Sequence, residues 1–145
     1  MCLLIDDDVS DTADFATAMA EIDSPYKVLT LASARDAIMK LRNGEIAPEV
    51  IFLDLNMPCV NGYEFLVYLK GQMRHRSIPV IVYSMASDPA EVNRTRKLGA
   101  HAFFEKPQSY DILKARLMSI FHELEPGNAT VKTSSLGGST PPRNQ

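Results

Sequence analysis

This sequence is poor in cysteine and lacks any long apolar segment, and each shortage excludes a class of protein. Only two of its 145 residues are cysteine, Cys2 and Cys59, too few for the disulfide framework of a small secreted domain. No apolar stretch approaches the roughly 20 residues that span a bilayer, and the first residues lack the basic-then-apolar pattern of a signal peptide. The net charge is −3, so the chain has no excess of positive charge with which to bind nucleic acid. We therefore expect a cytoplasmic protein with neither a membrane nor a nucleic-acid partner.

Short apolar segments alternate with stretches of helical length. Five segments predict strands because they are apolar or rich in β-forming residues and are bounded by turn residues: 2–5, 27–31, 50–53, 79–84 and 102–105. Apolar residues at three- and four-residue intervals, together with capping residues, predict helices at 11–22, 34–41, 63–69, 89–98 and 110–124. Continuous apolar strands between helices indicate an α/β fold, a doubly wound parallel sheet covered by helices on both faces.

The composition changes at residue 126. Twelve of the twenty residues in 126–145 are Pro, Gly, Ser or Thr, and none is acidic. Such a segment can bury very little apolar surface. We therefore expect one domain over residues 1–125, followed by a disordered tail or linker stub over 126–145.

Polar side chains gather where four of the predicted strands end, namely Asp6 and Asp7, Asp54, Ser84 and Lys106. In an open doubly wound sheet, ligands bind beyond these carboxyl ends. Three carboxylates close together repel one another unless a divalent cation intervenes, and oxygen ligands suit Mg²⁺ better than zinc. One carboxylate can act as a nucleophile toward a phosphoryl group whose charge the cation and a lysine neutralise. The sequence thus predicts a phosphoryl-transfer site with Mg²⁺.

Each of these residues also has a simpler interpretation when it is taken alone. Asp6 and Asp7 could cap the helix that follows them, Ser84 could be an ordinary hydroxyl at a strand end, and Lys106 could be a surface lysine. Cys59 lies near the predicted pocket, but a lone loop cysteine is usually incidental. The convergence of four strand ends on one edge favours the pocket.

Several motifs together resemble the receiver domain of two-component response regulators. They are Leu4-Ile5-Asp6-Asp7, the run from Leu53 to Pro58, Asn61-Gly62, Ser84, and Phe103-Phe104-Glu105-Lys106-Pro107. The resemblance covers residues 1–125 and implies a flavodoxin-like, five-stranded parallel sheet in the order 2-1-3-4-5.

The resemblance also implies roles for individual residues. Asp54 would accept the phosphoryl group, Ser84 would hydrogen-bond to it and Lys106 would pair with it. The ligands of Mg²⁺ would be Asp7 directly, Asp6 mainly through water, Asp54, and the backbone carbonyl of Asn56. Phe103 would be the switch aromatic that moves inward when Ser84 swings, and the Lys106–Pro107 peptide bond would be cis.

In that family, the phosphoryl group comes from a histidine kinase or a phosphotransfer protein. The surface formed by residues 89–98, 102–105 and 110–124 would then change and bind a downstream protein of unknown identity, with a homodimer also open. The chain would not be an enzyme beyond its own phosphorylation and dephosphorylation. It could stand alone or be a fragment of a longer hybrid protein.

Two alternatives from other classes of protein stay open. A phosphohydrolase of the haloacid-dehalogenase type also uses an aspartyl nucleophile, but it needs a second aspartate where this chain has Asn56. A receiver-like binding module that is never phosphorylated is the other alternative, because Met85 stands where the family usually has a small residue and could narrow access to Asp54.

Overall fold

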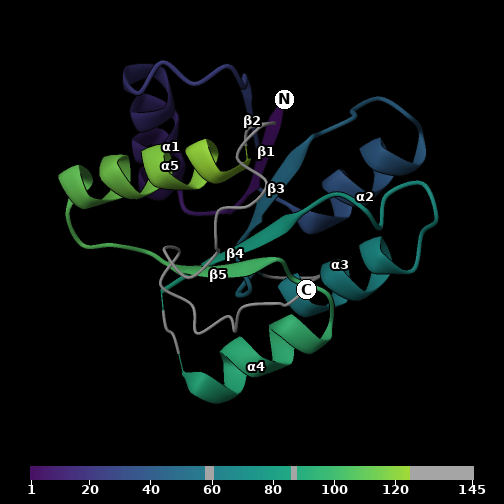
Figure 1. Ribbon diagram of the computed structural model, residues 1–145. Coiled ribbons are helices and arrows are strands. Elements are labelled where there is room, and N and C mark those ends of the chain that lie inside the picture. Colours follow the sequence, from purple (N-terminus) through teal and green to yellow (C-terminus); the bar gives the residue numbers. More distant parts are fainter. Residues whose placement is uncertain (58–60, 86–87, 125–145) are drawn as a thin grey trace.

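The computed structural model describes residues 1–57, 61–85 and 88–124, in which strands and helices alternate as predicted (Figure 1). The strands are β1 (Cys2–Ile5), β2 (Val28–Leu31), β3 (Val50–Leu53), β4 (Val80–Ser84) and β5 (Ala102–Glu105). The helices are α1 (Val9–Glu21), α2 (Ala34–Arg42), α3 (Gly62–Lys70), α4 (Pro89–Lys97) and α5 (Tyr110–Leu124). The tail expected at 126–145 lies outside the described residues, as do Pro58 and Cys59.

All five strands are parallel and form one sheet in the order β2-β1-β3-β4-β5. This confirms the predicted doubly wound fold. Strands β1, β3 and β4 are buried along their whole length, which explains their unbroken apolar sequences. Strand β2 is only partly buried at one edge, and its apolar pattern is correspondingly weaker.

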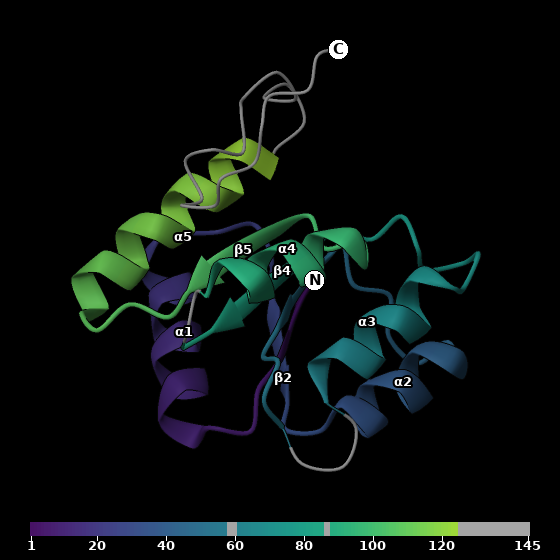
Figure 2. The same ribbon diagram turned by 90° about the horizontal axis from the view of Figure 1, so that it is seen from below.

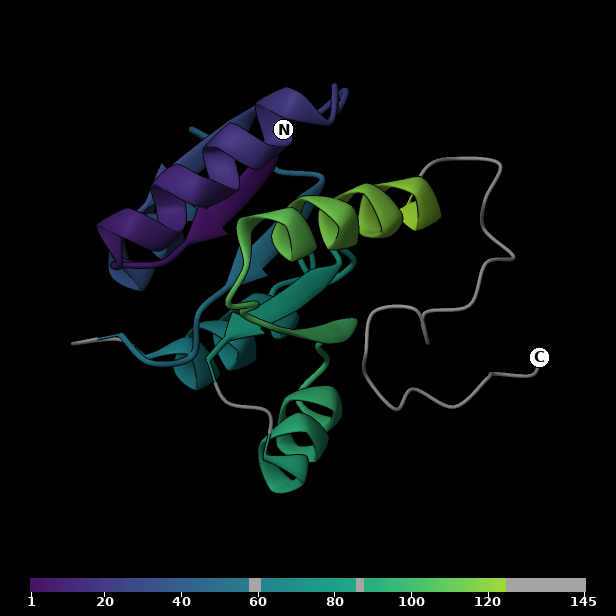
Figure 3. The same cartoon turned by 90° about the vertical axis from the view of Figure 1, so that its left-hand side faces the viewer.

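Helices cover both faces of the sheet (Figures 2 and 3). On one face, α1 and α5 pack over a core that contains five aromatic side chains: Phe15, Phe52, Tyr83, Phe104 and Phe121. On the other face, α2, α3 and α4 pack over an aliphatic core that also contains Phe65 and Phe103. None of the helices in the described residues is long and apolar enough to cross a bilayer.

Helix α1 begins earlier than predicted, at Val9, because Asp8 caps it. The Asp8 side chain accepts a hydrogen bond from the Asp11 backbone N–H at 3.0 Å. The alternative interpretation of Asp6 and Asp7 as caps of this helix is therefore wrong. Strand β4 begins one residue later than predicted, at Val80, because Pro79 has no N–H for the ladder.

The expected cis bond before Pro107 is also wrong. No peptide bond in the described parts of the chain is cis, so Lys106–Pro107 is trans. The trans form is the more stable one for most X–Pro bonds. With the trans bond in place, the Lys106 N–H donates to the Ser84 carbonyl at 2.7 Å and the lysine still lies at the strand end.

Candidate functional site

Backbone hydrogen bonds continue the sheet by one residue past the strand ends and so align the polar residues that follow. The Asp54 N–H donates to the Ile5 carbonyl at 2.9 Å, and the Asp6 N–H donates to the Leu31 carbonyl at 3.0 Å. The Lys106 N–H donates to the Ser84 carbonyl in the same way. Residues from four strand ends therefore meet at one edge of the sheet.

Three carboxylates form the centre of this site. One oxygen from each of Asp6, Asp7 and Asp54 lies within 4.8 Å of the other two. Asp6 and Asp54 are 1% and 7% exposed, whereas Asp7 faces solvent. Such a set of hard oxygen ligands, open on one side to water, fits a divalent metal ion.

Backbone N–H groups hold two of these carboxylates in place. The N–H of Asp8 donates to Asp6 Oδ1 at 3.0 Å, and that of Asn56 donates to Asp54 Oδ1 at 3.3 Å. The second oxygen of each carboxylate, Oδ2, contacts Lys106 instead. The two buried aspartates are thus oriented by their own loops before any ligand binds.

Lys106 lies among three carboxylates, one of which the sequence did not suggest. Its buried Nζ is 2.8 Å from Asp6 Oδ2 and 3.7 Å from Asp54 Oδ2, as the predicted pocket requires. It is also 2.8 Å from Oδ2 of Asp11, in the first turn of α1. A signal for Asp11 did exist: a side chain in the first helical turn points back toward the helix N-terminus, where Asp6 and Asp7 lie.

The pKa values of both Asp54 and Lys106 are raised, for different reasons. Burial raises the pKa of Asp54 to about 6, although the Lys106 ammonium acts to lower it and the Asp6 carboxylate adds to the rise. Burial would lower the pKa of Lys106, but its hydrogen bond to Asp11 and its ion pair with Asp6 outweigh burial and the pKa is raised. At neutral pH the lysine is therefore charged and Asp54 is largely ionised.

Ser84 ends β4 with a hydroxyl that is buried and, among the described residues, has no hydrogen-bond partner. An unpaired buried hydroxyl is costly unless a ligand completes it. An unpaired buried hydroxyl at this place suits the predicted hydrogen bond to an incoming phosphoryl group, which stays a prediction. The next residue, Met85, is 70% exposed, and its effect on access to Asp54 stays a prediction.

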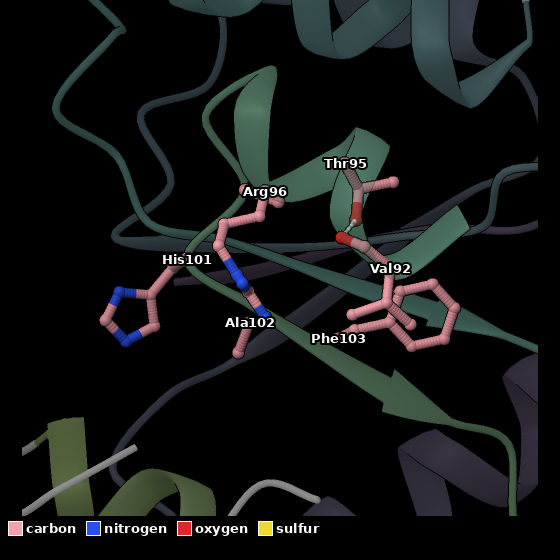
Figure 4. A pocket seen from close by; sticks show the side chains of 7 residues that line it. Val92, Thr95, Arg96, His101, Ala102 and Phe103 are labelled. Carbon is pink, nitrogen blue, oxygen red and sulfur yellow. Dashed lines mark hydrogen bonds between the residues drawn. The ribbon is translucent and has the colours of Figure 1, made fainter. Parts of the chain in front are cut away.

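Phe103, the predicted switch aromatic, is 5% exposed and already packed inward. Figure 4 shows its ring beside Val92, at one end of a hollow between α4 and β5. The Thr95 hydroxyl donates to the Val92 carbonyl at 2.9 Å and closes the helix side of this hollow. The structure thus places Phe103 in contact range of α4, and its role as the switch aromatic stays a prediction.

The profile of the response regulator receiver domain matches residues 2–118. The chain belongs to this family. The match covers every strand of the sheet and all four strand ends that build the site, and it confirms the family predicted from the motifs. Receiver domains exchange phosphoryl groups with histidine kinases or phosphotransfer proteins and act on downstream effectors.

Known relatives agree with this assignment. Two-component response regulator ORR1 of Oryza sativa subsp. indica is 31% identical over 124 residues, which is 81% of this chain and 54% of ORR1. The chain spans about half the length of the rice regulators it matches.

Solved receiver structures have the same fold. The structure of the phosphorylated cyanobacterial phytochrome response regulator RcpA gives a TM-score of 0.78 at 24% identity, covering 84% of this chain and 91% of RcpA. The Mn²⁺-bound form of response regulator Rcp1 gives 0.75 at 22% identity, covering 82% of this chain and 89% of Rcp1. At this level of identity, the likeness establishes the shared fold.

The loop that carries Asp54 depends on Gly62, at the start of α3. A Cβ at this position would lie 2.6 Å from both the Asp54 carbonyl oxygen and Leu55 Cα, and both atoms belong to the backbone. We expect Gly62→Ala to lower the free energy of unfolding by about 1–3 kcal/mol, the usual cost of overpacking. Urea denaturation measures this change.

Gly71→Ala is the matched control for that substitution. Its Cβ would meet only the Val67 and Tyr68 carbonyl oxygens, at 3.4 Å and 3.6 Å, which is ordinary contact. The control should stay within about 0.5 kcal/mol of the parent. Equal losses for the two variants would contradict the proposed close approach of α3 to the Asp54 loop.

Proposed function

We propose that this receiver is phosphorylated on Asp54 in a Mg²⁺-dependent phosphorelay and so switches a protein-binding surface. The observation that carries the proposal is the geometry around Lys106. The buried ammonium of Lys106 lies beside Asp54. Two further carboxylates, Asp6 and Asp7, complete a cluster that suits a cation. The buried Ser84 hydroxyl has no hydrogen-bond partner in the described residues. A site for the transferred phosphoryl group needs this combination of nucleophile, positive charge and hydrogen-bond donor.

In the proposed reaction, a carboxylate oxygen of Asp54 attacks the phosphorus of a phosphohistidine. The new O–P bond forms as the P–N bond breaks, and the electron pair of that bond stays on the histidine nitrogen. Asp6, Asp7, Asp54 and the Asn56 carbonyl would hold Mg²⁺, which would supply positive charge to the phosphoryl oxygens when bound. Lys106 would pair with one phosphoryl oxygen, and the Ser84 hydroxyl would donate to another.

The output of the switch follows from the position of Ser84. Ser84 ends β4, and β5 beside it carries Phe103, which packs near Val92 of α4. If the Ser84 hydroxyl turns toward the phosphoryl group, the packing around Phe103 changes and so does the surface of α4, β5 and α5. The donor would be a histidine kinase or a phosphotransfer protein in the cytoplasm, and the surface would bind a downstream protein or a second copy of the chain.

The domain boundaries belong to the same proposal. We assign residues 1–125 to the receiver, whose only catalysis would be its own phosphorylation and dephosphorylation. The proposal favours this over the phosphohydrolase alternative, because Asn56 offers no carboxylate where that class needs a second acid. Multiple turnover of a phosphorylated substrate would favour the hydrolase instead.

The test is to incubate the protein with Mg²⁺ and acetyl phosphate and to measure the intact mass. The parent should gain one phosphoryl group, Asp54→Asn should gain none, and EDTA should prevent the gain. Asp14→Asn is a matched control, because Asp14 is an exposed α1 residue that is not part of the carboxylate cluster, and it should be phosphorylated like the parent. A parent that neither gains mass nor binds beryllofluoride with Mg²⁺ would leave the non-phosphorylated binding module as the function.

A further inference from the structure

Asp11 belongs to none of the receiver motifs, yet it is one of the two nearest partners of Lys106. The two residues are 95 positions apart in the chain, and Asp11 Oδ2 lies 2.8 Å from Nζ. The lysine side chain is 6% exposed and that of Asp11 is 31% exposed, so water screens this ion pair only in part. The contact therefore has an appreciable effect on where the ammonium lies.

Asp11 differs from the other two partners of Lys106 in its relation to the metal ligands. Asp6 and Asp54 both belong to the cluster of carboxylates that fits a cation, but Asp11 does not. A cation bound to that cluster would weaken the attraction of Asp6 and Asp54 for the ammonium, because part of their charge would be neutralised. The attraction of Asp11 would persist.

The distances show which carboxylates hold the ammonium. Nζ is 2.8 Å from both Asp6 and Asp11 but 3.7 Å from Asp54, which is beyond hydrogen-bond length. A phosphoryl group on Asp54 needs the ammonium close to its oxygens, because the attraction grows as the separation shrinks. Lys106 must therefore lengthen its short contacts to reach the phosphoryl group. With a cation bound, Asp11 would be the carboxylate that still attracts the ammonium strongly.

We propose that Asp11 is a positioning residue that holds Lys106 back from Asp54 in the unphosphorylated protein and competes with the phosphoryl group for the ammonium. This inference rests on the proposed function and concerns how readily the same site is phosphorylated. It makes the first turn of α1 a determinant of phosphorylation rate in this chain.

The variant that tests the proposal is Asp11→Asn, which keeps the size of the side chain and removes its charge. With Mg²⁺ present, we expect this variant to bind beryllofluoride about three- to tenfold more tightly than the parent, and to be phosphorylated by acetyl phosphate faster by a similar factor. Without beryllofluoride, its affinity for Mg²⁺ should be unchanged or weaker, because the freed lysine then pairs more closely with the metal ligands. A merely structural role would not strengthen beryllofluoride binding without also strengthening Mg²⁺ binding.

Two controls separate the contact from charge in general. Asp14→Asn removes the same charge three residues further along α1 and should change beryllofluoride affinity by less than about twofold. In a Lys106→Met background, Asp11→Asn should have no effect on beryllofluoride binding, because the group it positions is missing. Asp11→Ala, a good helix former, replaces Asp11→Asn if circular dichroism shows that the asparagine variant is unfolded.

The failures of the two proposals are distinguishable. If the parent binds beryllofluoride and Asp11→Asn binds it no more tightly than Asp14→Asn, the role of Asp11 is overturned while the proposed function stands. If Asp11→Asn binds it more weakly than the parent, Asp11 aids phosphorylation and the competition is likewise overturned. A parent that is never modified and never binds beryllofluoride overturns both.

Discussion

Asp54→Asn should make the metal-free protein more stable at about pH 8, by roughly 2–3 kcal/mol. The reason is the burial of a charge. Folding raises the pKa of Asp54 from 3.8 to about 6, so the ionised carboxylate is less favourable in the folded protein than in the unfolded chain. Asparagine occupies the same space without the charge. Asp54, the proposed phosphorylation site, would then lower the stability of the folded protein.

The sign of the pH dependence follows from the same shift. Because the pKa is raised in the folded state, the folded protein binds the proton more tightly, and Asp54 destabilises it as pH rises through about 6. The advantage of Asp54→Asn should therefore be largest above about pH 7 and should vanish below about pH 4, where the carboxyl is protonated in both states. Urea denaturation in EDTA at several pH values measures it.

Mg²⁺ provides the complementary measurement. If Asp54 is a metal ligand, adding Mg²⁺ should raise the midpoint of unfolding of the parent more than that of Asp54→Asn, because a ligand that binds only the folded state stabilises it. Asp14→Asn, which loses an exposed charge on α1, should behave like the parent in both experiments. A parent and an Asp54→Asn variant of equal stability at about pH 8 would contradict the burial of an unfavourable charge.

Phe52→Ala should destabilise the protein by about 3–5 kcal/mol, the usual cost of removing a buried aromatic ring. Phe52 is fully buried in the middle of the sheet, two residues before Asp54 in the chain. Its ring centroid lies 4.9 Å from that of Phe15 on α1 and 5.8 Å from that of Phe121 on α5. The substitution therefore leaves a cavity where the sheet meets both helices of this face.

Thermal or urea unfolding checks this prediction, with Val67→Ala as the control. Val67 is 56% exposed on α3, so its truncation should cost less than about 0.5 kcal/mol. A loss of under about 2 kcal/mol for Phe52→Ala would mean that α1 and α5 close the cavity by repacking. That result would contradict a rigid aromatic core on this face of the sheet.

Much of the fold was predictable because its signals are local. Strands 2–5, 50–53 and 102–105 were predicted with the bounds that the structure has, since each is a short apolar run between turn residues. Local signals also lie at the two ends of α4, where Asp88 caps the first turn and Gly99, with φ of 108°, follows the last one. An error occurred where three neighbouring aspartates could each fill one role, and Asp8, not Asp6 or Asp7, capped α1.

The candidate site was predictable in its members and less so in its contacts. Parallel strands deliver their carboxyl ends to one edge, so Asp54, Ser84 and Lys106 could be brought together from sequence. Which carboxylates Lys106 prefers could not be predicted, because that depends on how closely separate elements approach: Nζ lies 2.8 Å from Asp6 and Asp11 but 3.7 Å from Asp54. The place of Asp11 in the first turn of α1 was a signal that it lies near the acidic edge, but its short contact to Lys106 became visible only in the folded chain.

The sequence by itself determined the order of the elements, the parallel sheet and the acidic edge, because these follow from periodicity and from residues next to one another in the chain. Only the tertiary structure decided the state of the groups at that edge. Burial raises the pKa of Asp54, and the approach of α1 to β5 gives Lys106 a partner other than the nucleophile. Both effects arise from long-range packing, which brings charges together that local sequence keeps apart.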